Sequence, residues 1–269
     1  MGAEFHGLLD EHAEGLRKPL YLQGQNGLAV ELDGPALRVR QPERAAVFYP
    51  LARLARVLSK GGVRWTCDAL LACAGAGVPV TFLDGDGEVR GYLFGPSSGE
   101  GGLYWRLRAC LSHADGLRRY ADWRRGMADH ARRALEQQLR QAGVCPEPVL
   151  AWRGLTPVGP GAAVAAPDQA VWWQMRGLLA GISAQLLVEA GLGAAQLARL
   201  EPLDLVGDLA ELLSWALAGP VLSAGRRPGE PGLDWGDDRA LTGLVEGRRE
   251  ELFRFGRLLL GRLQQWLET

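Results

Sequence analysis

The hydrophobic pattern of this 269-residue chain changes its period once, near residue 95. Before that point the apolar residues form short runs rich in β-branched and aromatic side chains, namely LYLQ, GLAVEL, ALRVR, AAVF, VTFLD and EVRGYLF. Such runs, separated by turn-forming GQNG, DGPA, PER and GDG, are typical of strands. After that point the apolar residues recur at helical spacing. The sequence therefore predicts a β-rich half followed by an all-helical half.

Two local signals refine the first half. The stretch TCDALLACAGAG predicts a helix with Thr66 as its N-cap, Asp68 in the first turn, and either Gly75 or Gly77 at its end. The stretch VTFLDGDGEVRGYLF predicts a hairpin, because Asp-Gly supplies the positive φ that a tight turn needs. We also expect Cys67 and Cys73, at either side of this helix, to be buried.

Four segments of the second half have helical periodicity, and they span residues 103–143, 168–193, 203–219 and 237–268. The second segment begins with an Asp168 cap after Pro167 and is apolar on most sides, as in a central bundle helix. The composition of PSSGEGG is that of a linker. The expected fold class is α+β, a small β-sandwich-like domain with one helix followed by an all-helical domain. The expected boundaries are an N-terminal extension (1–18), a β domain (19–95), a linker (96–102) and a helical domain (103–269).

Composition excludes several classes of protein. The formal net charge is −1, so nucleic-acid affinity would have to come from a local patch. The four cysteines lie far apart with no C-x-x-C pair, which argues against a disulfide framework or a zinc site. No apolar run reaches the roughly 18 residues of a membrane span, and the acidic start of the chain is unlike a signal peptide. We therefore expect a cytoplasmic protein that does not enter a membrane.

A pair of carboxylates is the first candidate site. In LDLVGDLAELL, Asp208 and Glu211 are three residues apart and share a helix face. Such a pair could contribute hard oxygen ligands to a divalent cation. It could equally be the solvated face of an amphipathic helix, because D-x-x-E is common on helix surfaces.

Several stretches in sequence order resemble the universal CRISPR adaptation integrase, the metal-dependent DNA nuclease that inserts new spacers into the array. The resemblance runs from about Pro19 to the C-terminus. In the first half it rests on residues 50–95, which end in GVPVTFLDGDGEVRGYLFG. In the second half it rests on DQAVWWQMRGLLAGISAQLLVEAGLG, LDLVGDLAELL and LTGLVEGRREELFRFGRLL.

The resemblance implies three metal ligands from different helices: a Glu from an E-G helix, a His from a loop, and an acid from the D-L-x-E helix. It places Glu211 on the last of these positions and Asp208 one turn earlier. The His should lie near Ala198, but every histidine of the chain precedes residue 131. The E-G helix should lie between Val144 and Pro167, where the chain has five prolines and Glu147 as its one acid. We therefore expect no intact catalytic site, and Mg²⁺ or Mn²⁺ bound weakly or not at all.

A cluster of arginines is the second candidate site. Between residues 106 and 140, nine arginines face four acids, a local charge of +5. Arginine pairs with phosphate oxygens, and Trp105 and Trp123 offer aromatic faces for stacking. The alternative is a surface helix in which these acids pair with arginines three or four residues away. The expected DNA-binding residues are Arg106, Arg108, Arg118, Arg119, Arg124, Arg125, Arg132, Arg133 and Arg140.

The resemblance, together with the missing ligands and the arginine cluster, implies a catalytically impaired, integrase-like DNA-binding protein that acts in, or derives from, spacer acquisition in antiviral defence. The resemblance implies double-stranded or branched DNA as ligand, a homodimer built on the β domains, and the small ferredoxin-like adaptation protein as partner. Two alternatives stay open. One is an active divalent-metal-dependent endonuclease or integrase with an atypical site. The other is a non-catalytic dimeric scaffold of a CRISPR-associated complex.

Overall fold

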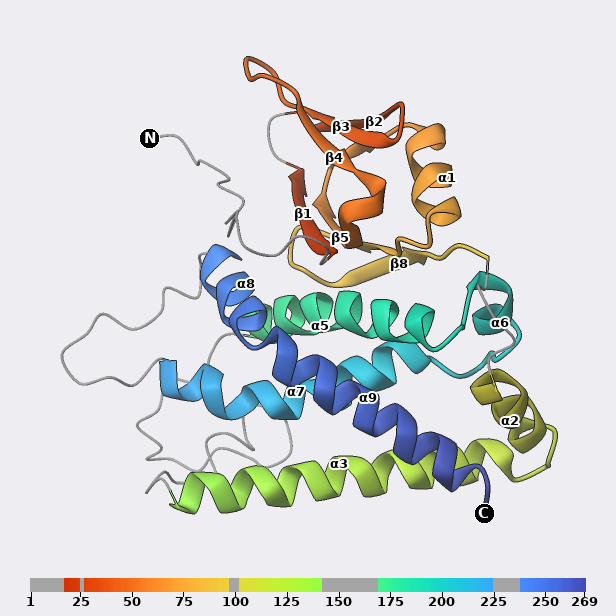
Figure 1. Ribbon diagram of the computed structural model, residues 1–269. Coiled ribbons are helices and arrows are strands. Elements are labelled where there is room, and N and C mark those ends of the chain that lie inside the picture. Colours follow the sequence, from red (N-terminus) through yellow and green to blue (C-terminus); the bar gives the residue numbers. More distant parts are fainter. Residues whose placement is uncertain (1–16, 25–26, 97–101, 142–168, 225–237) are drawn as a thin grey trace.

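Two small sheets lie at one end of the molecule and a set of helices lies at the other (Figure 1). The computed structural model describes residues 17–24, 27–96, 102–141, 169–224 and 238–269. The strands are β1 (Lys18–Gly24), β2 (Ala29–Asp33), β3 (Ala36–Arg40), β4 (Val47–Pro50), β5 (Leu54–Gly61), β6 (Arg64–Trp65), β7 (Val80–Leu83) and β8 (Val89–Leu93). The helices are α1 (Cys67–Gly75), α2 (Gly102–Leu111), α3 (Gly116–Gln141), α5 (Gln169–Glu189), α6 (Ala194–Ala198), α7 (Leu205–Ala224), α8 (Asp238–Gly247) and α9 (Arg249–Trp266). The expected α+β class, with a β-rich part before a helical part, is confirmed.

The first sheet has the strand order β1-β5-β7-β8 and the second has the order β4-β3-β2-β6. In the first sheet β5 pairs in parallel with β1 and β7, and β7 forms the expected antiparallel hairpin with β8. The hairpin turn uses Gly87, whose φ of 88° a side chain would disfavour. In the second sheet β3 pairs antiparallel with both of its neighbours, so β4 is an edge strand.

Two apolar clusters hold these layers together. One joins the two sheets and α1, with Leu22, Val30, Leu37, Val57 and Cys73 among its members. The other lies on the opposite face of the first sheet, where Leu58 and Leu83 pack with residues of α5, α7 and α9. Because β5 and β7 contribute to both clusters, the first sheet is covered on both faces, with α5 beneath it (Figure 1).

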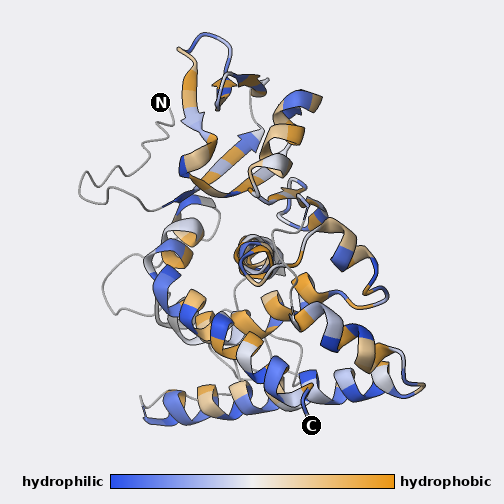
Figure 2. Ribbon diagram, turned by 45° about the vertical axis from the view of Figure 1, so that its right-hand side comes forward, coloured by the Kyte–Doolittle hydropathy of each residue, from blue (hydrophilic) through white to orange (hydrophobic). Residues whose placement is uncertain are grey.

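The apolar character of α5 follows from this central position. It packs against β5 and β7 on one side and against α7, α8 and α9 on the others. Met175, Leu179, Ile182 and Leu187 are almost fully buried. By contrast, α3 lies at the far end from the sheets and carries many hydrophilic residues along its length (Figure 2). In the described part of the chain, no helix has the length and hydropathy needed to cross a bilayer.

The structure corrects several details of the sequence analysis. The first long helical segment is two helices, because the chain turns at residues 112–115, and the last segment breaks at Arg248, whose φ and ψ are −112° and 14°. Thr66 caps α1 as expected and the helix ends at Gly75, while Gly77 takes the positive φ. Cys73 is buried, but Cys67 is exposed, because it is the first residue of α1 and lies away from the core. The Asp168 cap and most of the expected linker lie outside the described residues.

Candidate functional site

The first turn of α7 positions the two candidate carboxylates. Asp204 precedes the helix, and its Oδ1 accepts a hydrogen bond of 2.9 Å from the backbone amide of Gly207. Gly207 leaves room for this cap, since a Cβ at that position would lie 2.1 Å from Oδ2 of Asp204. The acids Asp204, Asp208 and Glu211 therefore follow one another along one side of the helix start. Asp204 was not among the residues expected from the sequence, although an acid just before an apolar helix is an N-cap signal.

Both carboxylate oxygens of Asp208 are occupied by side chains of α3. Oδ1 accepts a hydrogen bond from Nη1 of Arg124 and forms an ion pair with it. Oδ2 accepts a 3.0 Å hydrogen bond from the hydroxyl of Tyr120. The Asp208 side chain is only 13% exposed, and that of Arg124 is 46% exposed. The pair therefore lies at the edge of the α3–α7 interface, with the carboxylate buried in the interface and the guanidinium partly exposed to solvent.

The electrostatics of this cluster follow from burial and from the arginine. Burial raises the pKa of Asp208, and the hydrogen bonds from Arg124 and Tyr120 oppose that rise. The hydrogen bond to Asp208 raises the pKa of Arg124, and the negative charge of Glu211 adds to this effect. Glu211 itself is half-buried and makes no side-chain hydrogen bond or ion pair among the described residues.

The described residues do not fit a divalent metal. They contain no group of three or more His, Cys, Asp or Glu side chains that could hold a metal ion. Ala198, near which the resemblance places a histidine, is the last residue of α6. His113 lies between α2 and α3, and His130 lies on α3. Glu147 lies outside the described residues. A carboxylate pair one turn apart, with Asp208 already bonded to two side chains, is a poor ligand set for a hard cation.

The arginines of the second candidate site fall into two groups. Along the outer side of α3, Asp115, Asp122 and Asp129 pair with arginines three residues later, and Glu136 pairs with Arg132 and Arg140. Elsewhere Arg106 pairs with Glu268, Arg108 donates to the backbone carbonyl of Arg199, and Arg124 pairs with Asp208. The pairing pattern is that of a charged surface helix. The pairs within residues 115–140 join charges already counted in the local excess of +5. Glu268 and Asp208 lie outside that count, and each neutralises one arginine of the stretch.

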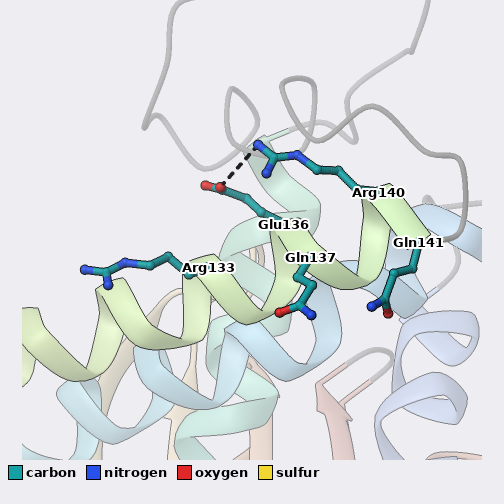
Figure 3. A pocket seen from close by; sticks show the side chains of 5 residues that line it. All are labelled: Arg133, Glu136, Gln137, Arg140 and Gln141. Atoms are coloured by element: carbon teal, nitrogen blue, oxygen red, sulfur yellow. Dashed lines mark ion pairs between the residues drawn. The ribbon is translucent and has the colours of Figure 1, made fainter.

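Exposure separates the arginines that could reach a phosphate from those that brace the fold. Arg118 and Arg125 are 74% and 73% exposed. Arg133 is also exposed, and in Figure 3 it points away from Glu136, which is paired with Arg140. A shallow hollow near the C-terminal end of α3 is lined, among the described residues, by Arg133, Glu136, Gln137, Arg140 and Gln141. Arg119 instead lies over the ring of Trp266, 5.6 Å from its centroid.

The two tryptophans of this region differ in the same way. Trp123 is half-buried and packs between Tyr120 and Trp266, with centroid distances of 5.8 and 6.1 Å. It therefore fixes α9 on α3 and offers no free face for a stacked base. Trp105 is 62% exposed on α2. Of the two aromatic faces expected from the sequence, Trp105 is the accessible one.

Solved structures define the class of fold. A CAS1 protein from Thermotoga maritima matches with a TM-score of 0.65 at 11% identity, over 94% of this chain and 97% of that one. The TtCas1–DNA complex matches with a TM-score of 0.59 at 18% identity, over 93% and 90%. A chain of the Cas6-RT-Cas1–Cas2 complex matches with a TM-score of 0.60 at 15% identity, over 94% of this chain and 35% of that one. No curated protein sequence matches the chain.

The family model described as CRISPR associated protein Cas1 matches residues 20–149. This match covers nearly half of the chain, and the fold of the solved Cas1 structures is shared over nearly all of it. The family resemblance inferred from the sequence is thus confirmed. The Cas1 family uses divalent metals. This is the reason to consider the carboxylates of α7 as metal ligands, because a carboxylate pair on a helix does not by itself indicate a metal site.

Proposed function

We propose that this protein is a Cas1-family DNA-binding protein of CRISPR spacer acquisition that does not itself catalyse cleavage or strand transfer. One observation carries the proposal: the acids at the family's ligand position have no co-ligand in the described chain, and Asp208 is held by Arg124 and Tyr120. The protein acts in the cytoplasm.

The reason for impaired catalysis is chemical. A bound Mg²⁺ or Mn²⁺ would activate a DNA hydroxyl or a water and stabilise the charge on the transferring phosphate. Glu211 and Asp208 alone offer two carboxylates, and one of these already has a cationic partner. Charge stabilisation in the transition state depends on groups held in place beforehand. No such set surrounds α7 in the described residues.

DNA binding rests on the excess charge of α2 and α3 and on its exposure. Exposed arginines paired within one helix can exchange a carboxylate for a phosphate at little cost, because surface ion pairs contribute only about 0–1 kcal/mol. Contacts with phosphate also release counterions, which makes binding sensitive to salt. Arg118, Arg125 and Arg133 are the arginines best placed to make such contacts.

The DNA-binding test changes these three arginines to glutamate together. Because each lost phosphate contact lowers the slope of log K against log salt by about 0.9, we expect the slope on duplex DNA to fall by about 3. The control reverses Arg17, Arg53 and Arg90, three exposed arginines of the β-rich part. It changes the net charge equally and should leave the slope unchanged. An unaltered slope in the α3 variant would show that these arginines do not contact DNA phosphates. It would favour the alternative of a non-catalytic scaffold.

The catalytic test compares wild type with Glu211→Ala on branched DNA in Mn²⁺. We expect neither protein to cleave or join strands, and we expect the substitution to change DNA affinity less than twofold. Metal-dependent cleavage by wild type that disappears in Glu211→Ala would instead show an active enzyme with an atypical site.

The partners follow from the relatives. TtCas1 is solved with DNA, and a Cas1-containing chain is solved in a complex with Cas2. We infer that this protein binds double-stranded or branched DNA, forms a homodimer through its β-rich part, and contacts the small ferredoxin-like adaptation protein. A protein of this kind would hold DNA within the adaptation complex while another subunit performs the chemistry.

A further inference from the structure

We propose that the guanidinium of Arg124 is a built-in cation for the carboxylates of α7, and occupies the place where this family implies a divalent metal. This inference rests on the proposed function, because it explains how a chain without the metal keeps the fold of its relatives. Arg124 is thus a positioning residue that joins α3 to α7.

The first support is the concentration of negative charge at one place. Asp204, Asp208 and Glu211 follow one another along the start of α7, and the charge of Asp204 acts on Asp208. Asp208 is largely withdrawn from water, with 13% of its side chain exposed. Carboxylates in such a setting need a cation or protons nearby, because desolvation disfavours the charged form.

The second support is that Arg124 reaches this cluster from another helix. Its Nη1 donates a hydrogen bond to Oδ1 of Asp208, and the charge of Glu211 also acts on it. Tyr120, from the previous turn of α3, donates to the other carboxylate oxygen of Asp208. A metal bound to two helices would make the same kind of cross-link. The guanidinium supplies one positive charge and directed donors, whereas a metal supplies two charges and a coordination sphere.

The third support is that the guanidinium stands at a position open to solvent. Nearly half of the Arg124 side chain is exposed, with its polar end against a carboxylate. Removal of the guanidinium would leave Asp208 and Glu211 facing a site that an ion could enter from water. The arginine therefore does more than replace the charge of a metal ion. It also prevents a metal ion from binding weakly at this site.

Thermal unfolding with and without Mn²⁺, in the absence of DNA, tests the proposal. Wild type should melt at the same temperature in both conditions. Arg124→Met should melt lower without metal, and Mn²⁺ should raise its midpoint by about 2–4 °C through preferential binding to the folded state. Arg124→Lys, which keeps the charge, should remain insensitive to Mn²⁺. Arg125→Met removes the neighbouring exposed arginine, paired with Asp122, and should show no metal effect.

A second variant identifies the ligands. Adding Asp208→Asn to Arg124→Met should abolish the Mn²⁺-dependent shift. If Arg124→Met does not fold alone, recovery of folded protein on refolding in Mn²⁺, but not without it, supports the proposal. Stabilisation of wild type by Mn²⁺, or an Arg124→Met protein that Mn²⁺ neither shifts nor rescues, overturns it. Loss of DNA binding in the Arg118, Arg125 and Arg133 variant tests the proposed function separately, since no DNA is present in the melting experiment.

Discussion

A single buried arginine ties the β-rich part to the helices. Arg56 of β5 is 1% exposed and forms a 2.6 Å ion pair with Glu246 of α8. Its other guanidinium nitrogen donates to Gln185 of α5 at 2.9 Å, and Tyr21 of β1 donates to Glu246. The ring of Phe253 lies 5.9 Å from the guanidinium carbon. Arg56 also donates to the hydroxyl of Tyr21 at 3.2 Å. This side chain thus links β5 to β1 and to three helices, so its loss should weaken the whole junction.

Arg56→Met is expected to destabilise the protein by about 2–4 kcal/mol, because Glu246 would lose its partner inside the structure. The expected loss is below that of a fully buried pair because Glu246 is 25% exposed. Urea unfolding measures the change. The control is Arg90→Met, whose ion pair with Glu88 is long, at 3.8 Å, and exposed, and whose loss should cost less than about 0.5 kcal/mol. Equal effects of the two substitutions would contradict a structural role for the buried network.

Among the helices and strands, the sequence predicted those features that depend on residues close together in the chain. The α1 cap, the β7–β8 hairpin and the order of sheets before helices follow from residues close together in the chain. The strand β5 was not singled out, because Arg56 and Lys60 interrupt its apolar pattern. Arg56 is buried only through partners far away in sequence. The break between α2 and α3 was also missed, since the residues there carry no proline.

The candidate site was predictable to the same extent. The spacing of Asp208 and Glu211 on one helix is a local property, and the pattern identified it. The pairing of Asp208 with Arg124 joins residues 84 positions apart, and no local rule selects one arginine of α3 over its neighbours. Family resemblance supplied the expected ligands. The packing of α3 on α7 shows that Arg124 and Tyr120 bind the carboxylate of Asp208.

The hairpin and α5 approach each other closely at a glycine. A Cβ on Gly177 of α5 would lie 2.4 Å from the carbonyl oxygen of Gly87, and about 3 Å from the methyl groups of Leu83. Neither neighbour can move freely, because Gly87 forms the turn and Leu83 belongs to the core beneath the sheet. This contact therefore sets the distance between the first sheet and the helices.

Gly177→Ala is expected to destabilise the protein by about 1–3 kcal/mol, as overpacking against backbone does. Gly126→Ala is the matched control, since a Cβ there meets nothing within 4 Å in the middle of α3. It should stabilise the protein by about 0.5–1 kcal/mol through helix propensity. Opposite signs in urea unfolding support the close approach, whereas stabilisation by both substitutions would refute it.

Both sheets of the molecule are open, and among their edge strands in the described chain β4 exposes large apolar side chains. The first sheet is covered on both faces, whereas β4 is one of the two outer strands of the second sheet, the other being the two-residue strand β6. Val47 and Phe48 on that strand are 50% and 52% exposed. An apolar edge strand is a template for pairing with another chain. A second copy of this chain, as the family resemblance implies, would cover it.

The last prediction concerns this edge. If two copies pair through β4, wild type should have the mass of a dimer in light scattering. Val47→Lys with Phe48→Lys should give a monomer that remains folded, because charge on an edge strand opposes pairing without disturbing the core. Leu71→Lys on α1 is the control, since Leu71 is 62% exposed in the same β-rich part but away from the edge. A monomeric wild type would refute the dimer, and dissociation by Leu71→Lys alone would place the interface on α1. A dimer that persists in the β4 variant would move the interface to another surface, and the apolar edge would then need a different partner.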